Sequence, residues 1–288
     1  MAEPTTILQA HEKYALPLAF ADNGGTFYSG GFDGTVSAWD AAEWTEVVTI
    51  HAHEQSVNCG TITTTDRLVT GSTDTSLRIW TSDLADREKT LTDHKKTIAG
   101  IASHPTKPII ASASYDTTAR VWDLERDASP MVLEGHSRNV TSVEFADEST
   151  LVTGGIGDEI VVWSLDSGEE LSRLGGHGQA VSGIAAQGES QVWSVGYNGT
   201  VRCWSTVDWT AITAVDLPGE QHPTGIAVNQ QTGDVAITRD GGVIVLDSDG
   251  EPQKEHAATI KGISTPLWSK DGETLCVGGA DGEIRIYR

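Results

Sequence analysis

The amino-acid sequence predicts an all-β fold: a seven-bladed β-propeller in which each blade has four antiparallel strands. Three observations predict it. A repeat of 41 or 42 residues runs through the 288-residue chain, its segments are short and alternate in polarity, and the first segment matches the end of other repeats. Four strands in each repeat of this length are typical of a propeller blade. We therefore treat residues 1–288 as one propeller domain.

The repeat is marked by an anchor residue, which is aromatic in six copies and leucine in one. The anchors are Trp39, Trp80, Trp122, Trp163, Trp204, Leu246 and Tyr287. Just before them the chain alternates, as in TVSAW, EIVVW and EIRIY, and this alternation predicts a strand. Tight-turn dipeptides such as Asp-Gly and Asn-Gly precede these strands and predict hairpins. No stretch predicts a long amphipathic helix.

The two ends of the chain predict how the ring closes. The segment TTILQ precedes His11 much as VVTI precedes His53, so it is expected to be an outermost strand. The last copy stops at Arg288, after what should be its third strand. We expect the N-terminal strand to complete the last blade, which leaves the ring without an exposed seam.

Three further columns of polar residues accompany the anchors. A Ser or Thr stands ten residues before five of the anchors, an Asp or Asn stands six residues before most of them, and a His precedes the first strand of five copies. The complete sets are His11, Ser29, Asp33 and Trp39; His53, Thr70, Asp74 and Trp80; and His94, Ser112, Asp116 and Trp122. The partial sets are His136, Thr153 and Trp163, with Gly157 in the Asp column, and His177, Ser194, Asn198 and Trp204. Copies 6 and 7 lack most of the set, so we expect the weak sector of the ring there.

These residues resemble the WD-repeat β-propeller family, and the resemblance covers the whole chain. The segments EGHSRNVTSVEFADESTLVTGG and DTTARVWD are close to the family consensus. The resemblance implies that Trp, the hydroxyl residue, His and Asp form a buried hydrogen-bond network inside each blade. Such a network is chemically sound because an indole N–H only donates, hydroxyl and neutral imidazole do both, and a carboxylate accepts.

Composition argues against two classes of partner. The 41 Asp and Glu residues outnumber the 19 Lys and Arg residues, and the net charge of −22 would repel nucleic acid and anionic membrane surfaces. The acidic residues are scattered, which favours a solvated surface suited to a salty, halophilic cytoplasm; a basic partner is the alternative. No membrane-spanning run or signal-peptide pattern is seen, and the three widely spaced cysteines indicate free thiols. We expect a cytoplasmic protein.

The sequence predicts no enzyme activity, catalytic residue, cofactor or metal. Ser, His and Asp recur together in several copies, whereas a catalytic triad appears once and needs an exposed nucleophile. His51, His53 and Glu54 suggest metal ligation, but a third ligand is not evident nearby and His53 belongs to the repeat. The glycine-rich stretch at 175–179 lacks the strand–loop–helix context of a phosphate-binding loop.

The main functional hypothesis is a protein-interaction scaffold. The residue before each turn Asp differs from copy to copy, and the WD-repeat resemblance implies that it opens onto the narrow face around the central channel, where partner peptides dock. The predicted partner-binding residues are Tyr14, Phe32, Tyr115, Asn139, Tyr197 and Arg239. In the alternative interpretation these side chains cover gaps between blades.

Two rival functions remain open at this point. A propeller enzyme or small-ligand binder would use the central channel, and it would need convergent polar groups with perturbed pKa values. An obligate subunit of a larger complex would expose an apolar patch on its rim.

Overall fold

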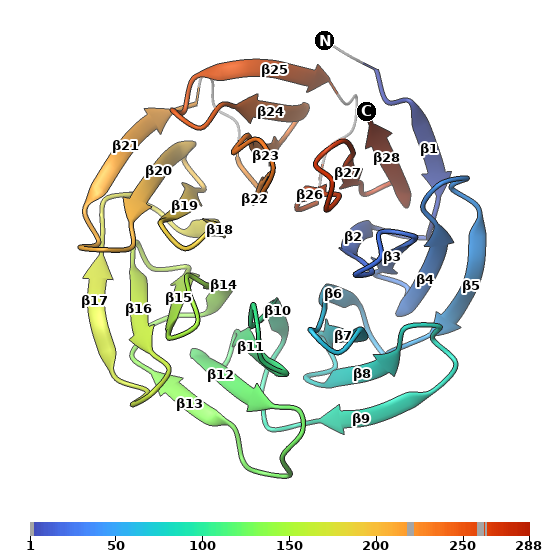
Figure 1. Cartoon of the computed structure of the whole chain (residues 1–288), viewed down its shortest axis with the longest axis horizontal. Helices are drawn as coiled ribbons and strands as arrows, with labels where there is room; N and C mark the ends of the chain where they lie inside the picture. Colours follow the sequence, from blue (N-terminus) through green and yellow to red (C-terminus); the bar gives the residue numbers. More distant parts are fainter. Residues whose placement is uncertain (1–2, 218–221, 258–261, 263) are drawn as a thin grey trace.

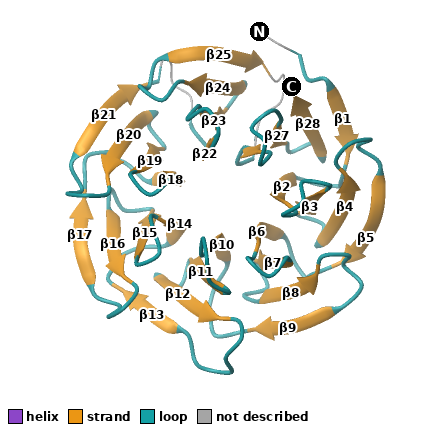
Figure 2. Ribbon diagram, viewed as in Figure 1, coloured by secondary structure: helices purple, strands orange, loops and turns teal. Residues whose placement is uncertain are grey.

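In the computed structural model, described for residues 3–217, 222–257, 262 and 264–288, every regular element is a β-strand and no helix occurs (Figure 2). Seven antiparallel sheets of four strands each are arranged in a ring (Figure 1). The predicted all-β, seven-bladed propeller is therefore confirmed. The same ranges contain no helix with the length and apolarity that crossing a bilayer requires.

Each blade runs from an innermost strand at the ring centre to an outermost strand at the rim (Figure 1). Blades 1 to 3 comprise β2 (Ala15–Phe20), β3 (Thr26–Gly31), β4 (Thr35–Asp40) and β5 (Glu46–His51); β6 (Val57–Ile62), β7 (Arg67–Ser72), β8 (Leu77–Thr81) and β9 (Arg87–Leu91); and β10 (Ile98–Ser103), β11 (Ile109–Ser114), β12 (Thr118–Asp123) and β13 (Met131–Glu134). Blades 4 to 6 comprise β14 (Val140–Phe145), β15 (Thr150–Gly155), β16 (Ile160–Ser164) and β17 (Glu170–Leu174); β18 (Val181–Gln187), β19 (Gln191–Gly196), β20 (Thr200–Ser205) and β21 (Ala211–Asp216); and β22 (Gly225–Val228), β23 (Val235–Arg239), β24 (Gly242–Leu246) and β25 (Pro252–Ala257). Blade 7 comprises β26 (Leu267–Trp268), β27 (Leu275–Gly278), β28 (Glu283–Tyr287) and β1 (Thr6–Gln9).

The ring is closed by the N-terminal strand. Strand β1 pairs antiparallel with β28, with Thr6 opposite Ile286 and Gln9 opposite Glu283. The backbone N–H of Thr5 extends the ladder by donating to the carbonyl of Ile286 at 2.8 Å. The expected closure is thus confirmed, and the outer edge of β28 is covered by β1.

The turns between the second and third strands are tight, and their sequence explains why. Gly34 follows Asp33 and has a φ of 84°, a backbone conformation that glycine adopts without steric cost. A Cβ at this position would lie 2.5 Å from the carbonyl oxygen of His53 in the next loop. The turn therefore fixes both the hairpin and the approach of the following blade.

The hydrophobic core lies between neighbouring blades, because each sheet has apolar residues on both of its faces. At the closure, Leu8 and Ile286 of blade 7 pack in one cluster with Phe20, Phe27 and Trp39 of blade 1. Blades 5 and 6 share a cluster in the same way. Packing of this kind makes each blade depend on its two neighbours for burial of its apolar surface.

Candidate functional site

One backbone contact recurs at the corner between the second and third strands of most blades. The N–H of the corner residue donates to a carbonyl in the loop that leads into the innermost strand. The contacts are Phe32 to Tyr14 at 2.9 Å, Thr73 to Ser56 at 3.0 Å, Tyr115 to Thr97 at 2.9 Å, Ile156 to Asn139 at 2.9 Å and Tyr197 to Ala180 at 2.8 Å. These five corner residues and the loops that they contact therefore lie on one face of the ring, which we call the corner face.

Two exposed aromatic stacks stand on the corner face. The ring of Phe32, in blade 1, stacks on Tyr14 with centroids 4.8 Å apart and planes 20° apart, and Phe32 is 40% exposed. The ring of Tyr197, in blade 5, stacks on His222 at 4.4 Å and 5°, and Tyr197 is 44% exposed. Exposed aromatic rings held by a neighbour lose little conformational entropy when a partner covers them, so these stacks are candidate contact points.

The other two partner-binding candidates on this face are less accessible. Tyr115 and Asn139 are half-buried. Tyr115 is held beside the loop that contains the exposed Lys95 and Lys96, because its N–H bonds to Thr97 and the hydroxyl of Ser114 donates to the carbonyl of Lys96 at 3.1 Å. This sector of the face therefore has two lysines near its aromatic residue, together with Asp116, which accepts from the N–H of Lys95 at 3.0 Å.

Arg239 was predicted to lie exposed at the corner of blade 6, and this prediction is wrong. Arg239 is only 5% exposed, lies within β23 opposite Gly242, and forms an ion pair with Glu255. The hairpin of blade 6 is one residue shorter than that of blade 1, because two residues separate the ends of β23 and β24 and three separate the ends of β3 and β4. Counting back from the anchor Leu246 therefore assigns Arg239 to the corner, whereas its pairing places it inside the sheet.

The same shorter hairpin shifts the hydroxyl column of blade 6. The residue paired like Ser29 is Ile237, opposite Ile244, and it is fully buried. Blade 7 has Val277 in this place. Both blades therefore pack apolar side chains where five other blades have a Ser or Thr that accepts from the anchor Trp.

Hydrogen bonds link the residues of the repeat columns in blades 1 to 5. In each of these blades the anchor indole N–H donates to the hydroxyl, and the hydroxyl lies next to the His Nε2. The five Trp–hydroxyl distances are 2.9 Å for Trp39–Ser29, 3.0 Å for Trp80–Thr70, 2.8 Å for Trp122–Ser112, 2.8 Å for Trp163–Thr153 and 2.8 Å for Trp204–Ser194. The five His–hydroxyl distances are 2.8 Å for His11–Ser29, 2.8 Å for His53–Thr70, 2.8 Å for His94–Ser112, 2.7 Å for His136–Thr153 and 2.8 Å for His177–Ser194.

The carboxylate end of the network varies between blades. His53 and His94 reach Asp74 and Asp116 directly, at 3.0 and 2.7 Å from their Nδ1 atoms. His11 instead lies 2.7 Å from the hydroxyl of Thr35, which donates to Asp33. In blade 5 a hydroxyl again stands next to the His Nδ1, at Thr200, and the amide of Asn198 donates to the carbonyl of His177 at 2.7 Å.

Blade 4 has no carboxylate in this place. Gly157 takes the Asp column, and the neighbouring Asp158 instead accepts from the N–H of Gly178, in the loop before blade 5, at 2.5 Å. Asp158 thus links blades 4 and 5 and does not extend the hydrogen-bond network of blade 4.

Burial and hydrogen bonding set the charge states of these groups. Burial lowers the pKa of His136 and His177 to about 4, with Arg173 and Arg202 acting in the same direction, so both rings are neutral at pH 7. Burial acts to raise the pKa of Asp74, but hydrogen bonds from His53 and Ser76 outweigh it and hold that pKa well below its ordinary value. A buried set of this kind, repeated in several blades, is part of the scaffold.

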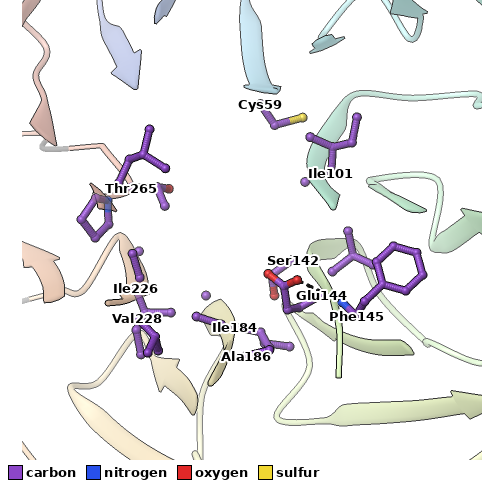
Figure 3. A pocket seen from close by; sticks show the side chains of 18 of the residues that line it. Cys59, Ile101, Ser142, Glu144, Phe145, Ile184, Ala186, Ile226, Val228 and Thr265 are labelled. Atoms are coloured by element: carbon purple, nitrogen blue, oxygen red, sulfur yellow. Dashed lines mark hydrogen bonds between the residues drawn. The ribbon is translucent and has the colours of Figure 1, made fainter. Parts of the chain in front are cut away.

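The centre of the ring contains a cavity of about 570 Å³. Its wall includes apolar side chains from several innermost strands, among them Ile101, Ile184 and Ile226, together with Ser142 and Glu144 of β14 (Figure 3). Burial raises the pKa of Glu144 to about 7, although the N–H of Phe145 donates to its carboxylate at 3.1 Å. Glu144 is thus a carboxyl group in this wall whose pKa lies well above the ordinary value, beside Asp147 and Glu189 in the same lining.

Neither Glu144 nor the stack of Tyr197 on His222 was predicted from the sequence. A signal for Glu144 was present, because Ser142 and Glu144 are two residues apart on a strand and so lie on one face. The WD-repeat resemblance implies that Tyr197 and His222 both lie on the narrow face, but their stacking depends on the fold, since the two residues are far apart in the sequence.

Comparison with known proteins identifies the family to which this propeller belongs. The family model described as "WD domain, G-beta repeat" matches residues 2–40, 44–81, 86–123, 128–164, 168–205 and 251–288, which together make up most of the chain. The chain belongs to the WD-repeat family. The unmatched stretch, 206–250, includes most of blade 6, where the hairpin is short and Leu246 replaces the anchor Trp.

Curated relatives of this WD-repeat propeller have varied names. The propeller is 35% identical over 242 residues to the WD repeat-containing protein VIP3 of Arabidopsis thaliana, and the aligned region covers 82% of this chain and 54% of VIP3. It is 25% identical to autophagy-related protein 16 of the same plant (62% and 35% covered) and 33% identical to the nuclear distribution protein PAC1 of Komagataella phaffii (53% and 34% covered). The WD-repeat propeller thus spans about a third to a half of the length of these relatives.

Proposed function

We propose that this WD-repeat propeller is a non-enzymatic interaction scaffold that binds a peptide or protein segment on its corner face. The observation that carries the proposal is the pair of exposed aromatic stacks, Tyr14 with Phe32 and Tyr197 with His222, which stand on the same face in different blades. Exposed aromatic rings are frequent anchors of protein interfaces. WD-repeat relatives are typically interaction scaffolds, which supports a protein partner in general.

The repeated Ser, His and Asp sets support a structural role and not a catalytic one. Their hydroxyl groups are buried and already accept from a Trp indole, so they offer no exposed nucleophile. We place the protein in the cytoplasm, where its three free cysteines would stay reduced.

The test compares two sets of variants as baits for affinity capture from the native cytoplasm at native salt, followed by mass spectrometry. The corner set combines Phe32→Ser, Tyr115→Ser and Tyr197→Ser. The matched rim set replaces three exposed apolar residues of the outermost strands, namely Val47→Ser, Leu171→Ser and Ile212→Ser, which are 66%, 57% and 52% exposed.

We expect the corner set to keep its circular dichroism spectrum and lose partners that the wild type and the rim set capture. A folded corner set that captures the same partners as the wild type would show that the corner face is not the site. Loss of partners from the rim set alone would assign the interface to the rim.

A second candidate function, ligand binding in the central channel, is supported by Glu144. Its half-buried carboxyl lies in a mainly apolar wall, and such a group can bind a small ligand that supplies a hydrogen bond or a positive charge. A thermal-shift screen of small amines and amides tests it. A ligand that stabilises the wild type but not Glu144→Gln would support this function, and a screen without such a ligand would count against it.

A further inference from the structure

The aromatic stack of blade 1 offers one open ring surface. Tyr14 covers one side of the Phe32 ring, and Gly262 lies close to Tyr14, since a Cβ built on it would be 3.3 Å from Cε2 of Tyr14. The hydrogen bond from the N–H of Phe32 to the carbonyl of Tyr14 holds the two residues in this arrangement. Phe32 is therefore a fixed, 40% exposed ring that a partner side chain can cover.

Acidic residues stand in the segments next to this stack. Glu12 precedes Tyr14 by two residues, and its N–H donates to Asp33 in the same corner at 2.9 Å. The loop that contains Glu54 is also close, since the hydroxyl of Ser56 donates to the carbonyl of Phe32 at 3.3 Å. Glu12 and Glu54 are both exposed.

Asp240 completes this group from blade 6. It accepts from the N–H of Gly262 at 3.4 Å, and Gly262 packs against Tyr14. Burial, and after it the Asp240 carboxylate, raises the pKa of Tyr14 to about 12, which indicates that the negative charge acts on the stack. The exposed Lys13 directly precedes Tyr14, and Lys261 lies outside the described residues.

The other corners differ in charge, although they share the same backbone geometry. The corner of blade 5 has a similar stack, but Asn198 takes the place of Asp33 in its turn. The corner of blade 3 has Tyr115 beside Lys95 and Lys96. An exposed stack with Asp33 in its own turn and Asp240 beside Tyr14 therefore distinguishes the blade 1 corner from the corners of blades 3 and 5.

We infer that the Tyr14–Phe32 corner binds a cationic side chain, Arg or Lys, from a basic segment of the partner. The electron-rich face of an aromatic ring attracts a cation, and nearby carboxylates strengthen that attraction. The net charge of −22 would also steer a basic segment toward the propeller. This inference rests on the proposed function, since it assigns a chemistry to one part of the corner face.

The test uses synthetic peptides and protein labelled with ¹⁵N only at Phe and Tyr. The chain has four Phe and five Tyr residues, so the amide spectrum contains few signals and Phe32→Leu identifies the Phe32 signal by its loss. Three probes of equal length are titrated at low and high salt: acetyl-GSGRGRGSG-amide and the two peptides in which both Arg are replaced by Glu or by Leu.

We expect the Arg peptide to shift the Phe32 and Tyr14 signals more than the Tyr197 signal, with an affinity that falls as salt rises. Phe32→Leu keeps an apolar side chain but removes the ring, and should weaken binding of the Arg peptide by about threefold or more. The double variant Glu54→Gln and Asp240→Asn should weaken it as well. The matched control Tyr197→Leu, at the corner where Asn198 replaces the turn Asp, should leave it unchanged.

Equal shifts with the Glu peptide or the Leu peptide, or no shift with any peptide at millimolar concentration, would overturn the cationic assignment. So would an unchanged affinity in Phe32→Leu. The proposed function has a separate outcome: if the partners captured by the wild type are lost from the corner set but the Arg peptide does not bind at Phe32, the face is the interface and only its assigned chemistry is wrong.

Discussion

Removal of the Ser112 hydroxyl tests whether the buried networks stabilise the blades. The Nδ1 of His94 lies 2.7 Å from Asp116, which as a carboxylate accepts, so this nitrogen carries the proton. The Nε2 therefore accepts from Ser112 at 2.8 Å, and the Ser112 oxygen accepts from the indole of Trp122 at 2.8 Å. Ser112→Ala removes both bonds at once.

The expected cost follows from burial. Ser112, His94 and Trp122 are 0%, 2% and 4% exposed, so water does not readily replace the lost hydroxyl. One buried donor and one buried acceptor are left unsatisfied, at about 1–3 kcal/mol each, which gives roughly 2–6 kcal/mol of lost stability. For a chain of this size, the melting temperature should fall by about 4–12 °C.

Thermal and urea unfolding of Ser112→Ala are measured beside Ser112→Thr. Thr is the matched control because Thr70 and Thr153 occupy the same position in blades 2 and 4. We expect Ser112→Thr to keep most of the stability. A loss below about 1 kcal/mol in Ser112→Ala, or equal losses in the two variants, would refute the reasoning.

Three further predictions follow from the fold. Deletion of residues 1–9 removes β1 and exposes the edge of β28, so the melting temperature should drop sharply, whereas deletion of residues 1–3 should have little effect; equal melting of the two truncations would contradict closure by β1. Folding raises the pKa of Glu144 from 4.5 to about 7. Protonated Glu144 therefore contributes its full stabilisation of the fold below pH 4.5, and this stabilisation is lost as the pH rises through 7. Glu144→Gln should therefore gain stability relative to the wild type between pH 5 and pH 8, by up to ~3 kcal/mol, and a constant difference in urea unfolding would count against this. Amide hydrogen exchange should be faster in blades 6 and 7, which lack the Trp–hydroxyl bonds, than in blades 2 and 3; the reverse order would show that the networks do not set local stability.

The sequence predicted the fold because the signals of a propeller are local and repeated. The spacing of anchors such as Trp39 and Trp80 gives the number of blades, and alternation in segments such as TVSAW gives their strands. The N-terminal segment TTILQ could be assigned to the last blade because it matches the outermost strands of other copies, and its pairing with β28 agrees.

Counting along the chain failed where one turn changed length. Arg239 keeps the same spacing to its anchor as Phe32, but the shorter hairpin of blade 6 draws it into β23 and buries it against Glu255. Spacing in sequence gives position in a sheet only while each turn has the same number of residues, and pairing between strands is what decides the register.

The sequence by itself thus determined the all-β class, the seven blades, their closure and the residue types of the Trp, hydroxyl, His and Asp columns. Only the tertiary structure decided which surface residues come together: Phe32 on Tyr14 with Asp240 of blade 6 nearby, Tyr197 on His222, and Glu144 in the wall of the channel. The physical reason is that strand patterns depend on neighbours along the chain, whereas exposure, stacking and local charge depend on residues that the ring brings together from distant repeats.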